Sequence, residues 1–287
     1  MLRKRVIVCL DVVDGRVVPG ARAATSGASG DPVELAAHYQ REGADEVMFV
    51  DASSSADGRR LLLEAVRRTA EQLFVPLTVG GGIREIGDIA LTLRAGADKV
   101  SINTAAVAHP ELITEAVQRF GSPCIIAAID ARLERRQIEI MSRPEGAPVD
   151  VAGAAPPATW FRVFTEGGAA ATQLDAVLWA RQCAELGAGQ ILITNLDQEG
   201  RRAGFDLELT ARIVEAVGVP VIAGGGAGNA DHIRDAFLLA GADAVCAAGI
   251  FLDGTTSVGA VKALLQEAGV PVRTADARTE LHEQRLS

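Results

Sequence analysis

The sequence has little from which a metal centre or a disulfide framework could be built. Its 287 residues include four cysteines and four histidines. The cysteines are scattered without a CxxC pair, and three of them lie in apolar, strand-like runs, which predicts buried free thiols. The histidines fall in helical or tail segments, so we expect no zinc site and no other metal or cofactor. These residues are Cys9, Cys124, Cys183, Cys246, His38, His109, His232 and His282.

Long apolar runs and an excess of positive charge are also missing. No run approaches the roughly 20 apolar residues of a membrane span, and the first strand-like run begins at Arg5, so we expect no signal peptide before the fold. The net charge of −9 argues against nucleic acid or an anionic membrane as the main partner, because both attract basic surfaces. We therefore expect a cytoplasmic, globular protein.

Short β-branched runs alternate with longer amphipathic segments along most of the chain. The strand candidates, in chain order, are RVIVCLD, DEVMFVD, PLTVGG, KVSIN, CIIAAID, QILITNL, PVIAGGG and AVCAAG. Near-continuous apolar strands that alternate with helices indicate parallel strands covered on both faces. Eight such units predict a (β/α)8 TIM barrel of the α/β class, with an open doubly wound sheet as the alternative.

The two halves of the chain repeat each other. VGGGIREIGDIALTLRAGADKV, which begins at Val79, resembles AGGGAGNADHIRDAFLLAGADAV, which begins at Ala223. Gly80 and Gly224 are 144 residues apart within this repeat. The repeat predicts a barrel made of two half-barrels related by a pseudo-twofold axis.

The spacing of two aspartates reveals an insertion in the second half. Asp11 and Asp130 end corresponding strands but are only 119 residues apart, so about 25 residues are inserted after Asp130. We place this insertion at about residues 133–160, which are rich in Pro, Ala and Gly, and expect an extended excursion after strand five. The prediction is a single barrel over residues 1–273 and a polar C-terminal tail over 274–287.

Glycine turns follow two of the predicted strands, at the end of the barrel that carries active sites in this fold. Gly81 and Gly82 follow the third strand, and Gly225 and Gly226 follow the seventh. Such turns bring backbone N–H groups next to a helix start, which suits a phosphate, although glycine also serves in plain tight turns. Because the pseudo-twofold relates the two turns, we favour a ligand with a phosphate at each end.

Charged residues stand at both ends of the predicted strands. Asp11 ends strand one and Asp130 ends strand five, on opposite sides of the barrel, so the two carboxylates can act as acid and base on a ligand between them. The alternative is that either aspartate only accepts backbone N–H bonds at its loop. Arg5, Glu46 and Lys99 begin strands at the other end. Such charges form a structural plug of salt bridges or guard an opening through the barrel.

Many of these segments resemble the cyclase subunit of imidazole glycerol phosphate synthase. The similarity runs through CLDVVDGRVV, GDPVELA, EGADEVMFVD, PLTVGGGI, GADKVSINTAAV, PELITEA, AIDA, GAGQILIT, GFDLELT and VPVIAGGGAGNADH, and covers about residues 1–273 apart from the insertion. It implies a lyase of histidine biosynthesis that forms a heterodimer with a glutaminase subunit. With ammonia from that subunit, the family converts a bisphosphorylated ribulosyl-aminoimidazole-carboxamide to imidazole glycerol phosphate and aminoimidazole carboxamide ribotide.

The resemblance also implies roles for individual residues. Asp11 and Asp130 match the family's acid/base pair, and Asp98 matches a position at the glutaminase-docking face. The positions implied for substrate and phosphate binding are Gly81, Gly82, Asn103, Thr104, Gly200, Arg201, Gly225, Gly226 and Gly249. The positions implied for a gate through which ammonia enters from below are Arg5, Glu46, Lys99 and Gln190.

This chain departs from the family pattern mainly at the second phosphate site. The substituted positions are Pro19 for a substrate-holding lysine, Gln190 for the fourth gate glutamate, Glu199 for an aspartate, Arg201 for a threonine, and Gly224 and Gly249 for serines. A basic stretch has also become GAAATQ at residues 168–173. Arg201 and Arg202 are cations that could replace the missing hydroxyl groups.

Three functions are compatible with this pattern. The first is the family cyclase, supported by both aspartates, three gate charges and an intact first phosphate site. The second is a paralogous ammonia-using or ring-closing enzyme for another phosphorylated metabolite, supported by the clustering of the departures at one end of the pocket. The third is a non-catalytic barrel subunit, which the loss of a loop lysine and a gate charge would fit, although the retained aspartates would not.

Overall fold

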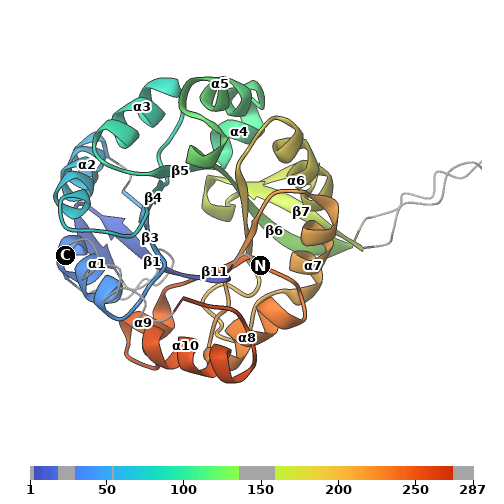
Figure 1. Ribbon diagram of the computed structural model, residues 1–287. Coiled ribbons are helices and arrows are strands. Elements are labelled where there is room, and N and C mark those ends of the chain that lie inside the picture. The colour runs from blue at the N-terminus through green and yellow to red at the C-terminus, as the bar shows by residue number, and fades with distance from the viewer. Residues whose placement is uncertain (1–2, 19–29, 54, 136–158, 274–287) are drawn as a thin grey trace, which may run out of the picture.

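The computed structural model describes residues 3–18, 30–53, 55–135 and 159–273, and its central feature is a closed barrel of eight parallel strands (Figure 1). The barrel strands are β1 (Arg5–Val13), β3 (Glu46–Asp51), β4 (Leu77–Gly80), β5 (Lys99–Ile102), β6 (Ile125–Arg135), β9 (Gln190–Asn195), β10 (Val221–Gly224) and β11 (Ala244–Ala247). Each strand pairs in parallel with the next, and pairing of β11 with β1 closes the ring. The predicted barrel is confirmed, and the open-sheet alternative is wrong.

Helices cover the outside of the barrel between successive strands (Figure 1). The longer ones are α1 (Pro32–Arg41), α2 (Ala56–Ala70), α3 (Ile86–Arg94), α5 (Glu111–Phe120), α6 (Ala176–Glu185), α7 (Leu207–Ala216), α8 (Ala230–Leu238) and α10 (Val258–Glu267). Two short helices, α4 (Thr104–Ala108) and α9 (Gly249–Leu252), and two 3-10 turns, η1 (Ser122–Cys124) and η2 (Glu166–Gly168), add to them. Within the described residues, every helix falls short of the length and apolar character that a bilayer span requires.

Local sequence sets where most of these helices begin. In six of the longer helices the preceding Asp, Asn or Ser accepts a backbone N–H of the first turn through its side chain, which satisfies a donor that has no partner within the helix. These capping residues are Asp31, Ser55, Asp175, Asp206, Asn229 and Ser257. Proline at the first position of α1 reinforces its start.

Three antiparallel strands that are not among the eight strand candidates extend the sheet beyond the ring. β2 (Arg16–Val18) folds back on the end of β1, and β7 (Thr159–Thr165) and β8 (Ala170–Asp175) add to the long strand β6. The predicted insertion at 133–160 therefore starts on β6 and ends on β7, while residues 136–158 and the tail at 274–287 lie outside the described residues.

Apolar side chains fill the barrel and the space between its strands and helices. Inside the ring, Ile7, Met48, Ile126, Leu192 and Ile222 form one buried cluster with Ala244 and Cys246. Two larger clusters lie between the strands and the helices, one on each side of the barrel. Because side chains alternate between the faces of a strand, the same short runs supply both the inner and the outer layers. Full burial of each large aliphatic side chain stabilises the fold by about 1.5–3 kcal/mol.

Candidate active site

Asp11 and Asp130 stand at the carboxyl ends of opposite strands. Three strands separate β1 from β6 in either direction around the ring. Asp11 is in register with Val50 of β3, and Asp130 is in register with Thr194 of β9. Both aspartates are half-buried. The ring therefore places the two carboxylate-bearing positions across the barrel mouth from each other, as a ligand lying between them would require.

A tight glycine turn follows β4 in the first half. Gly81 and Gly82 have φ angles of +81° and +64°, in the left-handed region that favours glycine. A Cβ atom on Gly81 would lie only 2.3 Å from the backbone oxygen of Asp51, so only glycine fits there. Arg59 braces this turn: its Nη1 atom donates to the Gly81 carbonyl (3.3 Å), and its Nη2 atom donates to Thr92 (2.8 Å).

Asn103 and Thr104 lie next to this turn in barrel order, because β5 neighbours β4. The Oδ1 atom of Asn103 is buried and has no hydrogen-bond partner among the described residues, which is costly unless something else supplies a donor. The Oγ1 atom of Thr104 accepts the backbone N–H of Glu166 (3.0 Å), which ties α4 to the β7–η2 turn. This part of the mouth therefore contains an acceptor that lacks a donor.

The second-half turn after β10 repeats this geometry with different neighbours. Gly225 and Gly226 have φ angles of +77° and +100°. A Cβ atom on Gly226 would lie 2.2 Å from the Gly204 carbonyl oxygen, and the Gly204 N–H donates to the carbonyl of Gly226 (2.8 Å). The loops after β9 and β10 are therefore packed backbone against backbone. Gly200, with a φ angle of +75°, turns the same β9 loop without such a close contact.

The two arginines of the second-half loop have different surroundings. Both are exposed, and the backbone N–H of Arg201 donates to the Gln198 carbonyl (3.1 Å). The guanidinium of Arg202 forms an ion pair with Asp253 and lies beside Gly249, the residue that follows strand β11 and opens helix α9. The sequence prediction included Arg201 among the phosphate-binding positions, whereas in the structure the neighbouring Arg202 is the arginine beside Gly249.

Charged and polar side chains form a closed network at the other end of the barrel, where strands begin. Glu46, which is 1% exposed, is its centre: its Oε2 atom accepts from Arg5 (2.9 Å) and Lys99 (2.6 Å), and its Oε1 atom accepts from Thr78 (2.5 Å). Arg5 also donates to the Oε1 atom of Gln190 (2.6 Å). A buried carboxylate is tolerable only when it is paired in this way.

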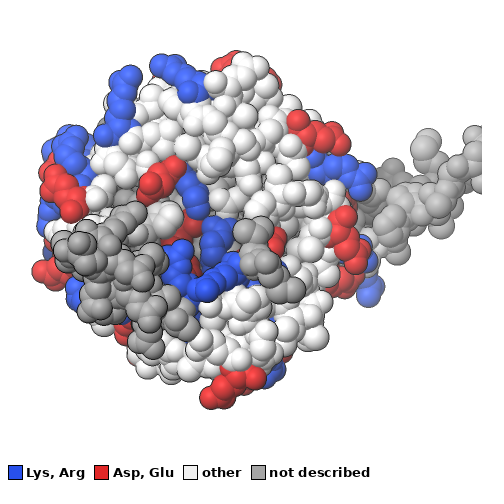
Figure 2. All heavy atoms as spheres, viewed as in Figure 1, with Lys and Arg blue, Asp and Glu red and all other residues white. Residues whose placement is uncertain are grey.

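The network lies at the amino ends of the barrel strands, because Arg5, Glu46, Lys99 and Gln190 are the first residues of β1, β3, β5 and β9. The barrel strands follow one another clockwise in Figure 1, and because β–α–β connections are right-handed, their amino ends face the viewer. Figure 2, drawn from the same side, shows Lys and Arg side chains gathered at the centre of that face, inside the ring of helices. The barrel therefore carries aspartates at one mouth and a cation-rich network at the other, separated by the apolar interior cluster.

Asp98 belongs to a repeated structural clamp on this same face. Three Gly-Ala-Asp segments precede barrel strands, and each aspartate accepts the backbone N–H of a residue at the start of the preceding strand. The pairs are Asp45 with Val6 (2.9 Å), Asp98 with Leu77 (2.8 Å) and Asp243 with Val221 (3.1 Å). The fourth copy has Gly189, where a Cβ atom would lie 2.1 Å from the Ser122 carbonyl oxygen. Asp98 thus has a structural partner within the chain.

The cysteines do not form a site. All four are free, and within the described ranges no group of three or more His, Cys, Asp or Glu side chains is placed to hold a metal. Cys183 and Cys246 are buried, whereas Cys9 and Cys124 are half-buried, and Cys124 ends the turn η1 rather than lying in a strand. Contact with the Cys246 thiol, burial and the nearby Asp11 charge raise the pKa of Cys9 well above its usual value. These features favour unreactive thiols.

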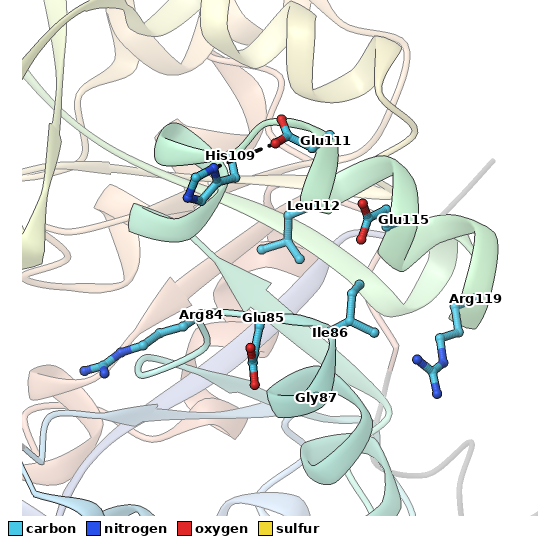
Figure 3. Close-up of a pocket in the computed structure, with 9 residues that line it drawn as sticks. All are labelled: Arg84, Glu85, Ile86, Gly87, His109, Glu111, Leu112, Glu115 and Arg119. Carbon is cyan, nitrogen blue, oxygen red and sulfur yellow. Dashed lines mark ion pairs between the residues drawn. The ribbon is translucent and has the colours of Figure 1, made fainter.

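A groove of about 450 Å³ lies on the outside of the barrel, between α3 and α5 (Figure 3). It is lined by Arg84, Glu85, Ile86, Gly87, His109, Glu111, Leu112, Glu115 and Arg119. His109, which the sequence pattern placed in a helix, lies in the turn between α4 and α5, and its Nδ1 atom is 3.7 Å from Glu111. None of the strand-end residues lines this groove, so it is separate from the candidate active site.

Sequence reading missed two polar residues that the structure joins to the candidate sites. Thr78 joins the lower network, and Arg59 braces the first glycine turn. Side chains two residues apart in a strand share a face, so Thr78 lies on the same face of β4 as Gly80. That spacing was a signal by which Thr78 could have been found. Nothing local marked Arg59, since it lies in a helix. Pro19 lies outside the described residues.

Comparisons with known proteins agree with this geometry. The family model described as "Histidine biosynthesis protein" matches residues 5–257. The chain is 52% identical over 274 residues to the imidazole glycerol phosphate synthase subunit HisF of Myxococcus xanthus, a match that covers 96% of this chain and 99% of that protein. It is 49% identical to the HisF subunit of Methanopyrus kandleri (95% and 98% covered) and 50% identical to that of Geobacillus thermodenitrificans (95% and 100% covered).

Proposed function

The chain belongs to the family of imidazole glycerol phosphate synthase HisF subunits, the cyclases of histidine biosynthesis, and on that premise we propose that Asp11 and Asp130 are its acid/base pair. In the proposed reaction the enzyme acts as a lyase. The substrate is the bisphosphorylated ribulosyl-aminoimidazole-carboxamide, and the products are imidazole glycerol phosphate and aminoimidazole carboxamide ribotide. The observation that carries the proposal is the position of the two aspartates at the ends of opposite strands, with a glycine turn after β4 and another after β10.

Opposed carboxylates suit the proton transfers of this reaction. Ammonia that adds to a carbonyl carbon must lose protons before a ring can close, and the nitrogen that leaves must gain one. One aspartate, as a carboxylate, accepts a proton on one side of the substrate, while the other, as a carboxylic acid, donates a proton on the opposite side. Two carboxyl groups divide these roles when their surroundings separate their pKa values. The ring of strands holds the two aspartates apart, so each addresses a different side.

The two glycine turns are the proposed phosphate sites. Gly81, Gly82, Asn103 and Thr104 form the first, where two glycines with left-handed φ angles turn the backbone before helix α3. The buried Asn103 Oδ1 atom is an acceptor, so it fits a hydroxyl of the substrate next to the phosphate and not the phosphate itself. The residues of the second are Gly200, Arg201, Gly225, Gly226 and Gly249. A phosphate at each end would stretch the substrate across the mouth, between the aspartates.

Ammonia is proposed to enter from the opposite end of the barrel. The matched relatives are named as subunits, and we propose a glutaminase as the partner of this chain, docked on the face that carries Asp98. Its ammonia would pass the network of Arg5, Glu46, Lys99 and Gln190. The apolar interior above that network favours neutral ammonia over ammonium, because burial of an unpaired charge is costly. We further propose that the complex acts in the cytoplasm.

An ammonia-dependent assay tests the acid/base assignment. The purified chain is supplied with ammonium chloride at alkaline pH and the bisphosphorylated substrate, and release of aminoimidazole carboxamide ribotide is measured. We expect turnover by the wild type and a loss of about 10²–10⁴-fold in kcat for Asp11→Asn and for Asp130→Asn. Asp57→Asn, an exposed aspartate in the first turn of α2, is the matched control and keeps wild-type rates.

Two results would count against the proposal. A folded wild-type chain with no turnover contradicts the substrate assignment, whereas an active Asp11→Asn or Asp130→Asn variant contradicts the acid/base roles. Glutamine-dependent turnover after addition of a glutaminase subunit from a relative tests the partner. If that mixture uses only free ammonium and no complex forms in size-exclusion chromatography, the proposed partner is wrong.

A further inference from the structure

Arg202 is held in an unusual backbone conformation by glycine contacts. Its φ angle is +58°, in the left-handed region that side-chain-bearing residues rarely adopt. Its carbonyl oxygen lies so close to Gly228 that a Cβ atom there would be 2.1 Å away. The loop after β9 is therefore fixed against the loop after β10 at this residue, which determines where the Arg202 side chain leaves the backbone.

The side chain of Arg202 ends at the loop after β11. Its Nη2 atom forms an ion pair with Asp253 and would lie 3.4 Å from a Cβ atom on Gly249. Asp253 is itself held by the backbone N–H (3.0 Å) and the hydroxyl (2.6 Å) of Thr255. Burial alone would raise the pKa of Asp253, but the Thr255 hydrogen bonds and the Arg202 charge hold it below its usual value, so the partner stays anionic.

The pseudo-twofold shows what this arrangement replaces. Gly249 comes 145 residues after Thr104, the hydroxyl-bearing residue of the first phosphate site, and both open a short helix after a barrel strand. In the second half Gly249 has no side chain, and the guanidinium of Arg202 lies beside that position, with Nη2 3.4 Å from where a Cβ atom would be. Of the three guanidinium nitrogens of Arg202, only Nη2 has a hydrogen-bond partner among the described residues, which is Asp253. The N–H groups of Nε and Nη1 are therefore the donors that a ligand would use.

We propose that Arg202 binds the second phosphate of the substrate and replaces, with a fixed cation, the hydroxyl that Gly249 lacks. This inference rests on the proposed function and names the residue that determines specificity at one end of the site. A guanidinium presents several N–H donors in one plane and binds phosphate oxygens in pairs. Asp253 keeps it in position through one nitrogen. The loops after the seventh and eighth strands are a common phosphate site in barrels of this class.

Steady-state kinetics of Arg202→Ala with the bisphosphorylated substrate tests the assignment. Because the phosphate is bound equally before and during the reaction, the loss should raise KM with kcat little changed. We expect KM to rise about 10- to 100-fold, the range of a charge-assisted hydrogen bond to phosphate. Arg202→Lys should recover part of the loss. The matched control is Arg67→Ala, which removes an exposed Arg–carboxylate pair from helix α2 and should leave KM unchanged.

A second variant separates binding from folding. Arg202→Ala combined with Gly249→Ser restores a hydroxyl where the guanidinium was, and should regain part of the lost affinity. Titration calorimetry with inorganic phosphate gives a readout without turnover: the wild type should show two sites, and Arg202→Ala should lose one. Circular dichroism and thermal unfolding confirm that each variant is folded.

The results distinguish failure of this inference from failure of the proposed function. Absence of wild-type turnover with two phosphate sites intact would contradict the proposed reaction and leave the phosphate assignment supported. A folded Arg202→Ala variant with wild-type KM and both phosphate sites would overturn the inference. A loss on Arg201→Ala in place of Arg202→Ala would overturn it too, because the neighbouring arginine would then be the ligand.

Discussion

Gly81→Ala tests whether the first glycine turn depends on a backbone contact that only glycine allows. The added Cβ atom would lie 2.3 Å from the backbone oxygen and 2.9 Å from the backbone nitrogen of Asp51. A side-chain rotation cannot relieve a Cβ overlap with backbone, so β3 or the turn must move. Gly269→Ala is the matched control: its φ angle of +77° is close to the +81° of Gly81, but no heavy atom lies within 4 Å of its added Cβ atom.

The magnitude follows from separating the two costs. Both variants put alanine in the left-handed region, which costs about 1–2 kcal/mol, and both recover about 0.4–1 kcal/mol from the stiffer unfolded chain. Gly81→Ala adds the displacement of packed backbone, about 1–3 kcal/mol if it resembles overpacking of a core. The difference between Gly81→Ala and Gly269→Ala should therefore be about 1–3 kcal/mol, or roughly 2–12 °C in Tm for a chain of this size.

Thermal scans and urea unfolding of both variants beside the wild type measure this difference. Because Gly81 belongs to a proposed phosphate site, Gly81→Ala should also raise KM for the bisphosphorylated substrate, whereas Gly269→Ala should not. Equal destabilisation of the two variants would refute the argument, since it would show that the Asp51 contact relaxes at no cost. Unchanged KM in a destabilised Gly81→Ala variant would refute the role of the turn in binding.

Three further predictions concern buried and capping groups. Lys262 pairs with Asp45 at 2.7 Å, and both are almost fully buried, so Lys262→Ala should lower the unfolding free energy by about 3–5 kcal/mol in urea titrations; a change under 1 kcal/mol would contradict this. Burial raises the pKa of Cys183 to about 12, so this thiol should resist a thiol reagent at pH 8 until the chain unfolds, and prompt labelling of Cys183 would show otherwise. The pKa of Asp31 is lowered, against the effect of its burial, by its α1 capping bond and by Arg68, so its stabilisation is present above pH 3.8 and disappears as the pH falls through the lowered value. Asp31→Ala should thus cost about 1 kcal/mol at pH 7 and progressively less as the pH falls below 3.8, and a cost independent of pH would exclude the ionised cap.

Much of the fold and of the site could be predicted from local sequence. The alternation of short apolar runs with amphipathic segments gave the eight strands and the barrel, because periodicity depends only on neighbours in the chain. Paired glycines at Gly81 and Gly225 marked turns for the same reason, since a left-handed φ angle is a property of one residue. Asp11 and Asp130 could be placed on opposite strands once the strands were counted and the repeat was seen.

Tertiary structure decided which side chains meet. Local sequence predicted that Arg5, Glu46 and Lys99 begin strands at one end of the barrel, as a plug of salt bridges or a guarded opening. Only the closed ring shows that Arg5, Lys99 and Thr78 all meet at the Glu46 carboxylate. The antiparallel strands β2, β7 and β8 depend on pairing with strands already in place, which their weak local patterns do not specify.

The proposed second phosphate site shows this division between sequence and structure most clearly. The sequence by itself determined that Gly249 lacks a side chain and that Arg201 and Arg202 follow each other in one loop. Only the folded chain shows that Arg202 is the one beside Gly249, because three loops from different strands converge there and the backbone of Arg202, with its left-handed φ angle, directs the guanidinium to Gly249. Contacts between loops form only when the barrel closes. Local sequence favours that closure, but it does not fix the distances between loops to within the length of one side chain.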